Sequence, residues 1–229
     1  MNQKLYEQLE LSISKDRLDE YANILGTNKT KTIFTYYILN SEISKSLYIP
    51  LQNLEVALRN NIHKALTKYH NTDEWYEVEN FLSYNEIKKI NDAKQKLSKS
   101  RQEITPSKII SELSFGFWTS LFNKNYDQKI WNKHIKQIFP NMPKYKRNRI
   151  IVSEQINAIR YYRNRIFHFD HIFSKRDLPQ IHINILDMIK WLNIALHDVT
   201  VEFDEFNDIC KNETKNTIHK LNKLNQKYL

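Results

Sequence analysis

Residues 51–66 read LQNLEVALRNNIHKAL and carry the cleanest periodic pattern in the chain. Their large apolar side chains recur at helical spacing: Leu51, Leu54, Leu58, Ile62 and Leu66. Spacings of three and four residues place these side chains on one face of an α-helix, and that face must be buried. The stretch therefore predicts a core helix, around which other elements pack.

The composition favours an all-α protein. The chain has 229 residues and is 41% hydrophobic, which is enough to build a core. It has two glycines and five prolines, too few for a sheet with many tight hairpins or for a glycine-rich phosphate loop. No repeat and no long linker divides it. We expect a single helical bundle domain over residues 1–229, with a core at about 30–198 and a polar helix at about 205–227.

Cap and breaker residues set the expected helix boundaries. A first helix is expected over residues 5–25, ended by Gly26. A helix over residues 106–121 should start at a threonine cap followed by proline. It would contain Gly116, and close packing of two helices would explain a glycine there. Further helices are expected over residues 84–100 and 180–197.

The charge balance and the single cysteine narrow the classes of function. Lys+Arg is 35 and Asp+Glu is 26, a formal net charge of +9, which suits a polyanionic partner or simply keeps the protein soluble. Cys210 is the only cysteine, so an internal disulfide and a cysteine-based zinc site are excluded. The first residues lack the apolar core of a signal peptide, and no uncharged run suits a membrane span. We expect a cytoplasmic protein that does not enter a membrane.

Residues 163–168, RNRIFH, contain a charge where an apolar residue is expected. At about 100° per residue, Arg163 lies within a stripe of buried positions. Burying an unpaired guanidinium costs on the order of several kcal/mol. We therefore expect Arg163 to have a specific role. His168 lies about 140° from Arg163 on a regular helix. The two side chains face one point only if the helix ends or bends between them, or if His168 reaches round from the edge. The stripe consists of Val152, Ile156, Ile159 and Ile166.

A second charge occurs on the apolar face of the helix at residues 51–66. Glu55 lies among its leucines, and Arg59 flanks it. We expect Glu55 to pair with Arg163 or with Arg59 and to orient a guanidinium. The alternative is that each charge lies at a core margin and reaches water.

Three blocks of the chain resemble one protein family. Arg163-Asn164-x-x-x-His168 resembles the R-x(4–6)-H motif of the HEPN superfamily. Residues 54–60, LEVALRN, and 112–118, ELSFGFW, resemble segments of its bacterial Abi-like (abortive infection) branch. The blocks occur in the family's order, and the resemblance covers roughly residues 30–195.

The resemblance implies an all-α fold with a HEPN-like core and extra helices. It implies a metal-independent endoribonuclease without a cofactor, acting as a toxin in phage defence or in a toxin–antitoxin system. Some relatives are restrained by a small noncoding RNA. HEPN enzymes commonly pair two motifs across a dimer or across two domains, and this chain has one good motif, so a homodimer is a candidate assembly. Arg59 and His63 are one residue too close for the motif, and we do not expect a second centre there.

RNA supplies its own nucleophile, the 2′-hydroxyl group, so the protein must move protons and stabilise the phosphate. Histidine both accepts and donates protons near neutral pH, and arginine grips phosphate oxygens with two parallel hydrogen bonds. If the resemblance holds, His168 is the general acid and base, and Arg163 stabilises the transition state. Asn164 would position the phosphate or His168, Glu55 would hold the arginine, and Arg59 would add charge.

Basic side chains near the motif are candidate contacts to the RNA backbone. Neighbouring tyrosines are candidates for stacking on unpaired bases, or for ordinary packing. The basic candidates are Lys144, Lys146, Arg147, Arg149, Arg160 and Arg165, with a second basic run over residues 88–101. The tyrosines are Tyr145, Tyr161 and Tyr162.

Two other functions fit the same residues. A non-catalytic RNA-binding protein, held in a complex with a small noncoding RNA, needs the same basic surface. A helical interaction protein would use the motif only as an ion-pair network. A metal enzyme is disfavoured, because His168 and His171 lack further ligands with suitable spacing.

Overall fold

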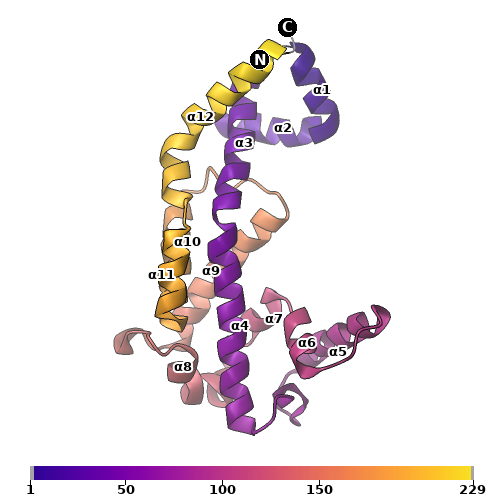
Figure 1. Ribbon diagram of the computed structural model, residues 1–229, viewed down its shortest axis with the longest axis vertical. Coiled ribbons are helices and arrows are strands. Elements are labelled where there is room, and N and C mark those ends of the chain that lie inside the picture. Colours follow the sequence, from indigo (N-terminus) through magenta and orange to yellow (C-terminus); the bar gives the residue numbers. More distant parts are fainter. Residues whose placement is uncertain (1–2, 228–229) are drawn as a thin grey trace. The chain divides into compact units, whose positions relative to one another are not determined.

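The computed structural model describes residues 3–227, and all secondary structure in this range is helical (Figure 1), which confirms the all-α prediction. The α-helices are α1 (Gln3–Ile13), α2 (Lys15–Leu25), α3 (Thr30–Ser46), α4 (Tyr48–His70), α5 (Tyr84–Lys99), α6 (Pro106–Glu112), α7 (Phe115–Ser120), α8 (Asn132–Ile138), α9 (Arg149–Phe167), α10 (Leu178–Leu192), α11 (Ile194–Glu202) and α12 (Phe206–Lys227). Short helical turns are η1 (Trp75–Glu77), η2 (Lys124–Tyr126), the π-helical η3 (Asp127–Trp131) and η4 (Lys144–Lys146).

Helix α4 confirms the core helix expected from residues 51–66. All five apolar side chains of its stripe are buried. Pro50 lies in the first turn of α4, where the missing backbone N–H group leaves no intrahelical hydrogen bond unmade. The predicted stripe of α9 is also buried, from Val152 through Ile166.

The prediction of one helix over residues 5–25 is wrong, because the chain breaks at Ser14. Ser14 has a φ of 81°, outside the helical region, and its hydroxyl oxygen accepts a hydrogen bond from the Arg17 backbone N–H at 3.4 Å. It therefore ends α1 and caps α2. The expected stop at Gly26 is confirmed, since Gly26 has a left-handed φ of 60° after α2.

The helix expected over residues 106–121 is also two helices. Thr105 caps α6 as predicted, accepting from the Lys108 N–H at 3.4 Å. Leu113 is extended, with a ψ of 126°, so α6 ends there and α7 begins at Phe115. Gly116 is therefore in the first turn of a short helix, and a Cβ atom there would meet only the Ser114 Oγ atom, at an ordinary 3.6 Å. Close helix packing does not explain this glycine.

The single helix expected over residues 180–197 is likewise divided, into α10 and α11. The side-chain oxygen of Asn193 accepts from the Leu196 N–H at 3.0 Å and so caps α11. Asparagine forms such local bonds more readily than it continues a helix, and the apolar pattern alone does not reveal the break.

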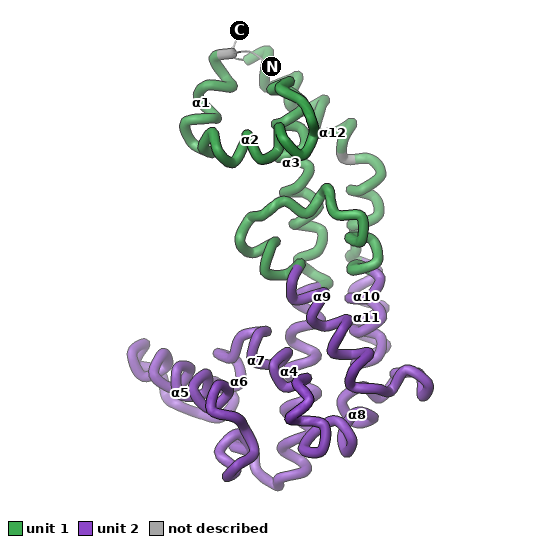
Figure 2. Tube along the Cα trace, turned by 180° about the vertical axis from the view of Figure 1, so that it is seen from behind, with its two compact units in different colours: residues 1–50, 162–182, 203–229 green, residues 51–161, 183–202 purple. Residues whose placement is uncertain are grey.

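The chain forms two compact units, and each is built from separate segments (Figure 2). Unit 1 contains residues 1–50, 162–182 and 203–229, and unit 2 contains residues 51–161 and 183–202. Helices α4, α9 and α10 each begin in one unit and end in the other. The single-domain organisation over residues 1–229 stays a prediction.

Unit 1 is held together by two helices that pack on α3 (Figure 1). These are α12, from the C-terminal end of the chain, and α2, which precedes α3 in the sequence. Its core contains Leu18, Tyr21, Ile33 and Phe34. Asp204 ties the start of α12 to α10: one carboxylate oxygen accepts from the Phe206 N–H at 3.1 Å, and the other lies 2.6 Å from Nε2 of the buried His182.

Unit 2 has an aromatic core. Trp131 stacks on Phe122 with ring centroids 4.0 Å apart, and its indole N–H donates to the Leu121 carbonyl oxygen at 2.6 Å. Trp75 is fully buried and donates its indole N–H to Nδ1 of His63 at 2.9 Å. Within residues 3–227, no helix is long and apolar enough to cross a membrane.

Candidate active site at the end of helix α9

The motif occupies the last turn of α9 and the residue that follows it. The backbone N–H of His168 donates to the Asn164 carbonyl oxygen at 2.9 Å, so the helical path continues as far as His168. The helix therefore stays regular through its last residue, Phe167, and no bend separates Arg163 from His168. The two motif side chains leave α9 about 140° apart and about 7.5 Å apart along its axis.

Arg163 turns its guanidinium toward the C-terminal end of α9. Its Cζ atom lies over the ring of Phe167, 4.4 Å from the centroid and one turn further along the helix. Such a cation–π contact fixes the direction of the guanidinium. Arg163 is half-buried, and Asn164 and His168 are exposed. The guanidinium and the imidazole thus both belong to the end of α9, but they leave the helix on different faces.

The helix ends in a Schellman motif built on Phe169. Phe169 has a left-handed φ of 59°, its N–H donates to the Ile166 carbonyl oxygen at 3.1 Å, and the Asp170 N–H donates to the Arg165 carbonyl oxygen at 2.9 Å. Glycine is the usual residue here, and a larger residue costs about 1–2 kcal/mol. Strain of this kind occurs at functional sites. His168 immediately precedes this strained residue.

Two side chains from the N-terminal helices hold the chain after His168 in place. A guanidinium nitrogen of Arg17 donates to the Phe169 carbonyl oxygen at 2.8 Å. The buried Asn40 donates to the Asp170 carbonyl oxygen at 3.2 Å, and its own oxygen accepts from the Ile172 N–H at 2.7 Å. Neither residue was predicted from the sequence. A polar residue on the apolar face of α3 was a usable signal for Asn40, whereas nothing local marks Arg17.

The two residues expected to support Arg163 lie in unit 2. Glu55 and Arg59 are one turn apart on α4, and both are half-buried. The Arg59 Nε–H donates to the side-chain oxygen of Asn60 at 3.2 Å. Arg163 belongs to unit 1, so its pairing with Glu55 stays a prediction.

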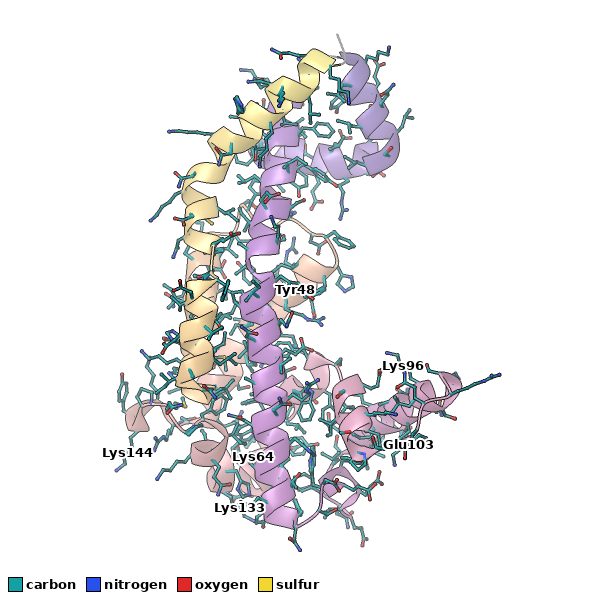
Figure 3. All side chains as sticks on the ribbon, in the orientation of Figure 1. Tyr48, Lys64, Lys96, Glu103, Lys133 and Lys144 are labelled. Carbon is teal, nitrogen blue, oxygen red and sulfur yellow. The ribbon has the colours of Figure 1, made fainter. Side chains whose placement is uncertain are left out.

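The basic residues around the start of α9 divide into two kinds. Lys144 projects from η4 and is exposed (Figure 3), and the ammonium group of Lys146 lies 5.4 Å from the ring centroid of Trp191. Arg147 donates its Nε–H to the Met142 carbonyl oxygen at 2.9 Å. Arg149 pairs with Asp127 and donates to the Phe122 carbonyl oxygen at 3.0 Å. The two arginines thus also support their own loops.

On α9 itself, Arg160 is half-buried and Arg165 is committed to the loop that follows. The Arg165 Nε and Nη2 groups donate to the His171 carbonyl oxygen at 3.2 and 3.0 Å. Of the neighbouring tyrosines, Tyr145 is exposed, while Tyr162 is buried and donates its hydroxyl to Asp177.

Two other histidines, one in each unit, have structural partners. Nδ1 of His171 lies 2.9 Å from the Glu20 carboxylate, and burial lowers the pKa of His171 although Glu20 acts in the opposite direction. Burial also lowers the pKa of His63, whose Nδ1 accepts from Trp75. Among the described residues, no group of three His, Cys, Asp or Glu side chains is arranged to hold a metal ion.

Comparison with known proteins adds no relative. No family model matches the chain, and neither a curated protein nor a solved structure is significantly similar to it.

Proposed function

We propose that the protein is a metal-independent endoribonuclease that cleaves RNA through attack of the 2′-hydroxyl group. The observation that carries the proposal is the motif at the end of α9, where an exposed imidazole follows a phenylalanine ring that carries a guanidinium on its face. Its resemblance to the HEPN motif supports the same chemistry, together with the net charge of +9.

His168 would remove the proton from the 2′-hydroxyl group and protonate the leaving 5′-oxygen. Arg163 would hold the non-bridging phosphate oxygens while negative charge develops on them. Asn164 would position the phosphate. Glu55 and Arg59 would act indirectly: Glu55 would orient Arg163, and Arg59 would add positive charge.

The proposed biological role rests on the resemblance alone: a cytoplasmic toxin of phage defence or of a toxin–antitoxin system, for which a noncoding RNA is a candidate antitoxin. A homodimer would bring two copies of the motif together, as is common in HEPN enzymes. His63 is engaged by Trp75, which favours the expectation that residues 59–63 are not a second motif.

His168→Ala should lower RNA cleavage by at least about a hundredfold, because general acid–base catalysis contributes that much or more. The measurement incubates labelled RNA with wild-type and variant protein in the presence of a chelator. In a bacterial host, the wild type should slow growth and degrade RNA, and the variant should not.

The matched control is His219→Ala, which removes another exposed imidazole of unit 1, on α12. This control should cleave normally. Equal cleavage by the His168→Ala protein, with an unchanged melting temperature, would remove His168 from the mechanism.

A non-catalytic RNA-binding protein is the second candidate. The regular course of α9 favours it, because Arg163 and His168 leave the helix on different faces. This candidate expects RNA binding without products, and equal binding by the wild type and by His168→Ala.

A further inference from the structure

A pocket of about 480 Å³ lies within unit 1, at the C-terminal end of α9. It is lined by α2, α3, the first residue of α4 and the end of α9, where Phe167 and Phe169 flank His168. Its volume is within the range of small-molecule sites, roughly 300–1,000 Å³. His168 does not line the pocket itself, but it lies between two lining residues in the sequence.

Three of the lining aromatic rings are exposed, although Arg163 lies over one face of the Phe167 ring. Tyr48 is 54% exposed, Phe167 44% and Phe169 75%. Tyr48 is the first residue of α4 (Figure 3), and its ring centroid lies 6.4 Å from that of Phe167. Exposed rings beside a pocket have flat faces available for a planar partner, and proteins that bind single-stranded RNA stack bases on such rings.

Phe169 presents its ring from a strained backbone. Its left-handed conformation suits glycine or asparagine, and a phenylalanine there costs stability without burying its side chain. The Arg17 hydrogen bond to the Phe169 carbonyl oxygen fixes this conformation. The arrangement is understandable if the exposed ring contacts a ligand.

The charge of the pocket is positive. Arg17 and Lys45 line it, and none of its described lining residues carries a carboxylate. Lys45 lies 3.4 Å from Glu42, but this pair is exposed, and exposed pairs contribute little. Both cations can therefore meet an anionic group such as a phosphate.

We propose that this pocket binds one unpaired nucleotide of an RNA strand, with its base against the rings of Tyr48 and Phe167 and its phosphate at Arg17 and Lys45. The proposal deepens the proposed function, because the neighbouring phosphodiester would then reach His168. A base inside a duplex cannot enter such a pocket, so the site selects single-stranded RNA.

The test measures binding of a short single-stranded RNA to the His168→Ala protein, so that cleavage does not interfere. Adding Tyr48→Ala should weaken binding about fivefold to a hundredfold, the usual effect of losing one stacked base. Tyr48→Phe should retain binding, because the ring face remains. The control is Tyr84→Ala, which removes an exposed tyrosine at the start of α5 in unit 2 and should have no effect.

Photo-crosslinking locates the base independently. A single-stranded RNA carrying a photoreactive uracil should attach to Tyr48, Phe167 or Phe169, and the same RNA in a duplex should not. Equal binding by the Tyr48→Ala and Tyr84→Ala proteins, or crosslinks only outside the pocket, would overturn the proposal and leave the pocket to another occupant, such as a protein segment.

The two proposals fail in different ways. If cleavage depends on His168 but not on Tyr48, the nucleotide-pocket proposal is contradicted and the nuclease proposal is supported. If the protein never cleaves RNA but Tyr48→Ala loses RNA binding, the nuclease proposal is contradicted and the pocket proposal is supported.

Discussion

Glu86 is a buried carboxylate in unit 2 that remains ionised because its neighbours stabilise the charge. The Tyr126 hydroxyl donates to it at 2.7 Å, Ser83 donates a second hydrogen bond, and the Lys89 ammonium group is 4.0 Å away. Burial alone would raise the pKa of Glu86, but these hydrogen bonds and Lys89 leave it below the ordinary value of 4.5. Burial together with the bond to Glu86 raises the pKa of Tyr126 to about 12.

Glu86→Gln should lower the free energy of unfolding by about 1–3 kcal/mol at neutral pH, the usual contribution of hydrogen bonds to a charged group. A carboxylate whose pKa is lowered in the folded state stabilises the protein above its unfolded pKa, and this stabilisation disappears as the pH falls through the folded pKa. The difference between wild type and variant should therefore shrink at about pH 3. Denaturant titration at both pH values measures it.

Glu103→Gln is the control for this change, because Glu103 is an exposed carboxylate in the same unit (Figure 3). It should alter the unfolding free energy by less than about 0.5 kcal/mol at either pH. A Glu86→Gln effect that is equally large in acid would contradict the assignment.

At the scale of elements, Asn40 connects helix α3 to the loop after α9. It uses both ends of its amide: the nitrogen donates to the Asp170 carbonyl oxygen, and the oxygen accepts from the Ile172 and Phe173 N–H groups. The loop begins at the strained Phe169, so this clamp helps to hold the candidate site together. Its bonds join residues 130 or more positions apart in the sequence.

Asn40→Ala should lower the free energy of unfolding by about 2–3 kcal/mol, because buried backbone groups lose their partners. Amide hydrogen exchange should quicken first at Ile172 and Phe173. Asn40→Asp keeps the acceptor and should protect these two amides better than alanine does. Asn91→Ala, an exposed asparagine of α5, is the control. Unchanged exchange at Ile172 in the alanine variant would show that the clamp does not hold the loop.

The helix boundaries show how far local sequence carries a prediction. The caps at Gly26 and Thr105 were predictable, because each acts on the helix it adjoins. The breaks at Ser14, Leu113 and Asn193 were not, because the apolar pattern continues across them while the backbone turns. Where the segments before and after a break pack against different neighbours, the stability gained from packing exceeds the stability lost by interrupting the helix.

At the scale of the whole molecule, the net charge of +9 should govern how RNA binds. Each phosphate contact releases counterions, so about four contacts to single-stranded RNA would give a slope of about −3 in a plot of log affinity against log salt. Measuring the affinity of the His168→Ala protein between about 50 and 200 mM salt tests this dependence. A flat response would contradict backbone contacts.

The contribution of the η4 lysines to RNA binding can be distinguished from the effect of the total charge of the protein. Replacing both Lys144 and Lys146 by glutamine should reduce the slope by about 1.4 if both contact phosphates. Replacing Lys211 and Lys215, two exposed lysines of α12, removes the same charge elsewhere and should change the slope less.

The sequence by itself determined that the protein is helical, which faces of α4 and α9 are buried, and where a guanidinium and an imidazole occur on one helix. These features depend on residue type and on spacing within a few turns. Only the tertiary structure decided that α9 stays regular to His168, that Phe169 follows in a left-handed conformation, and that Arg17 and Asn40 hold it there. Arg17 meets Phe169 across 152 positions of sequence, and such a hydrogen bond depends on how the helices pack, which no local pattern encodes.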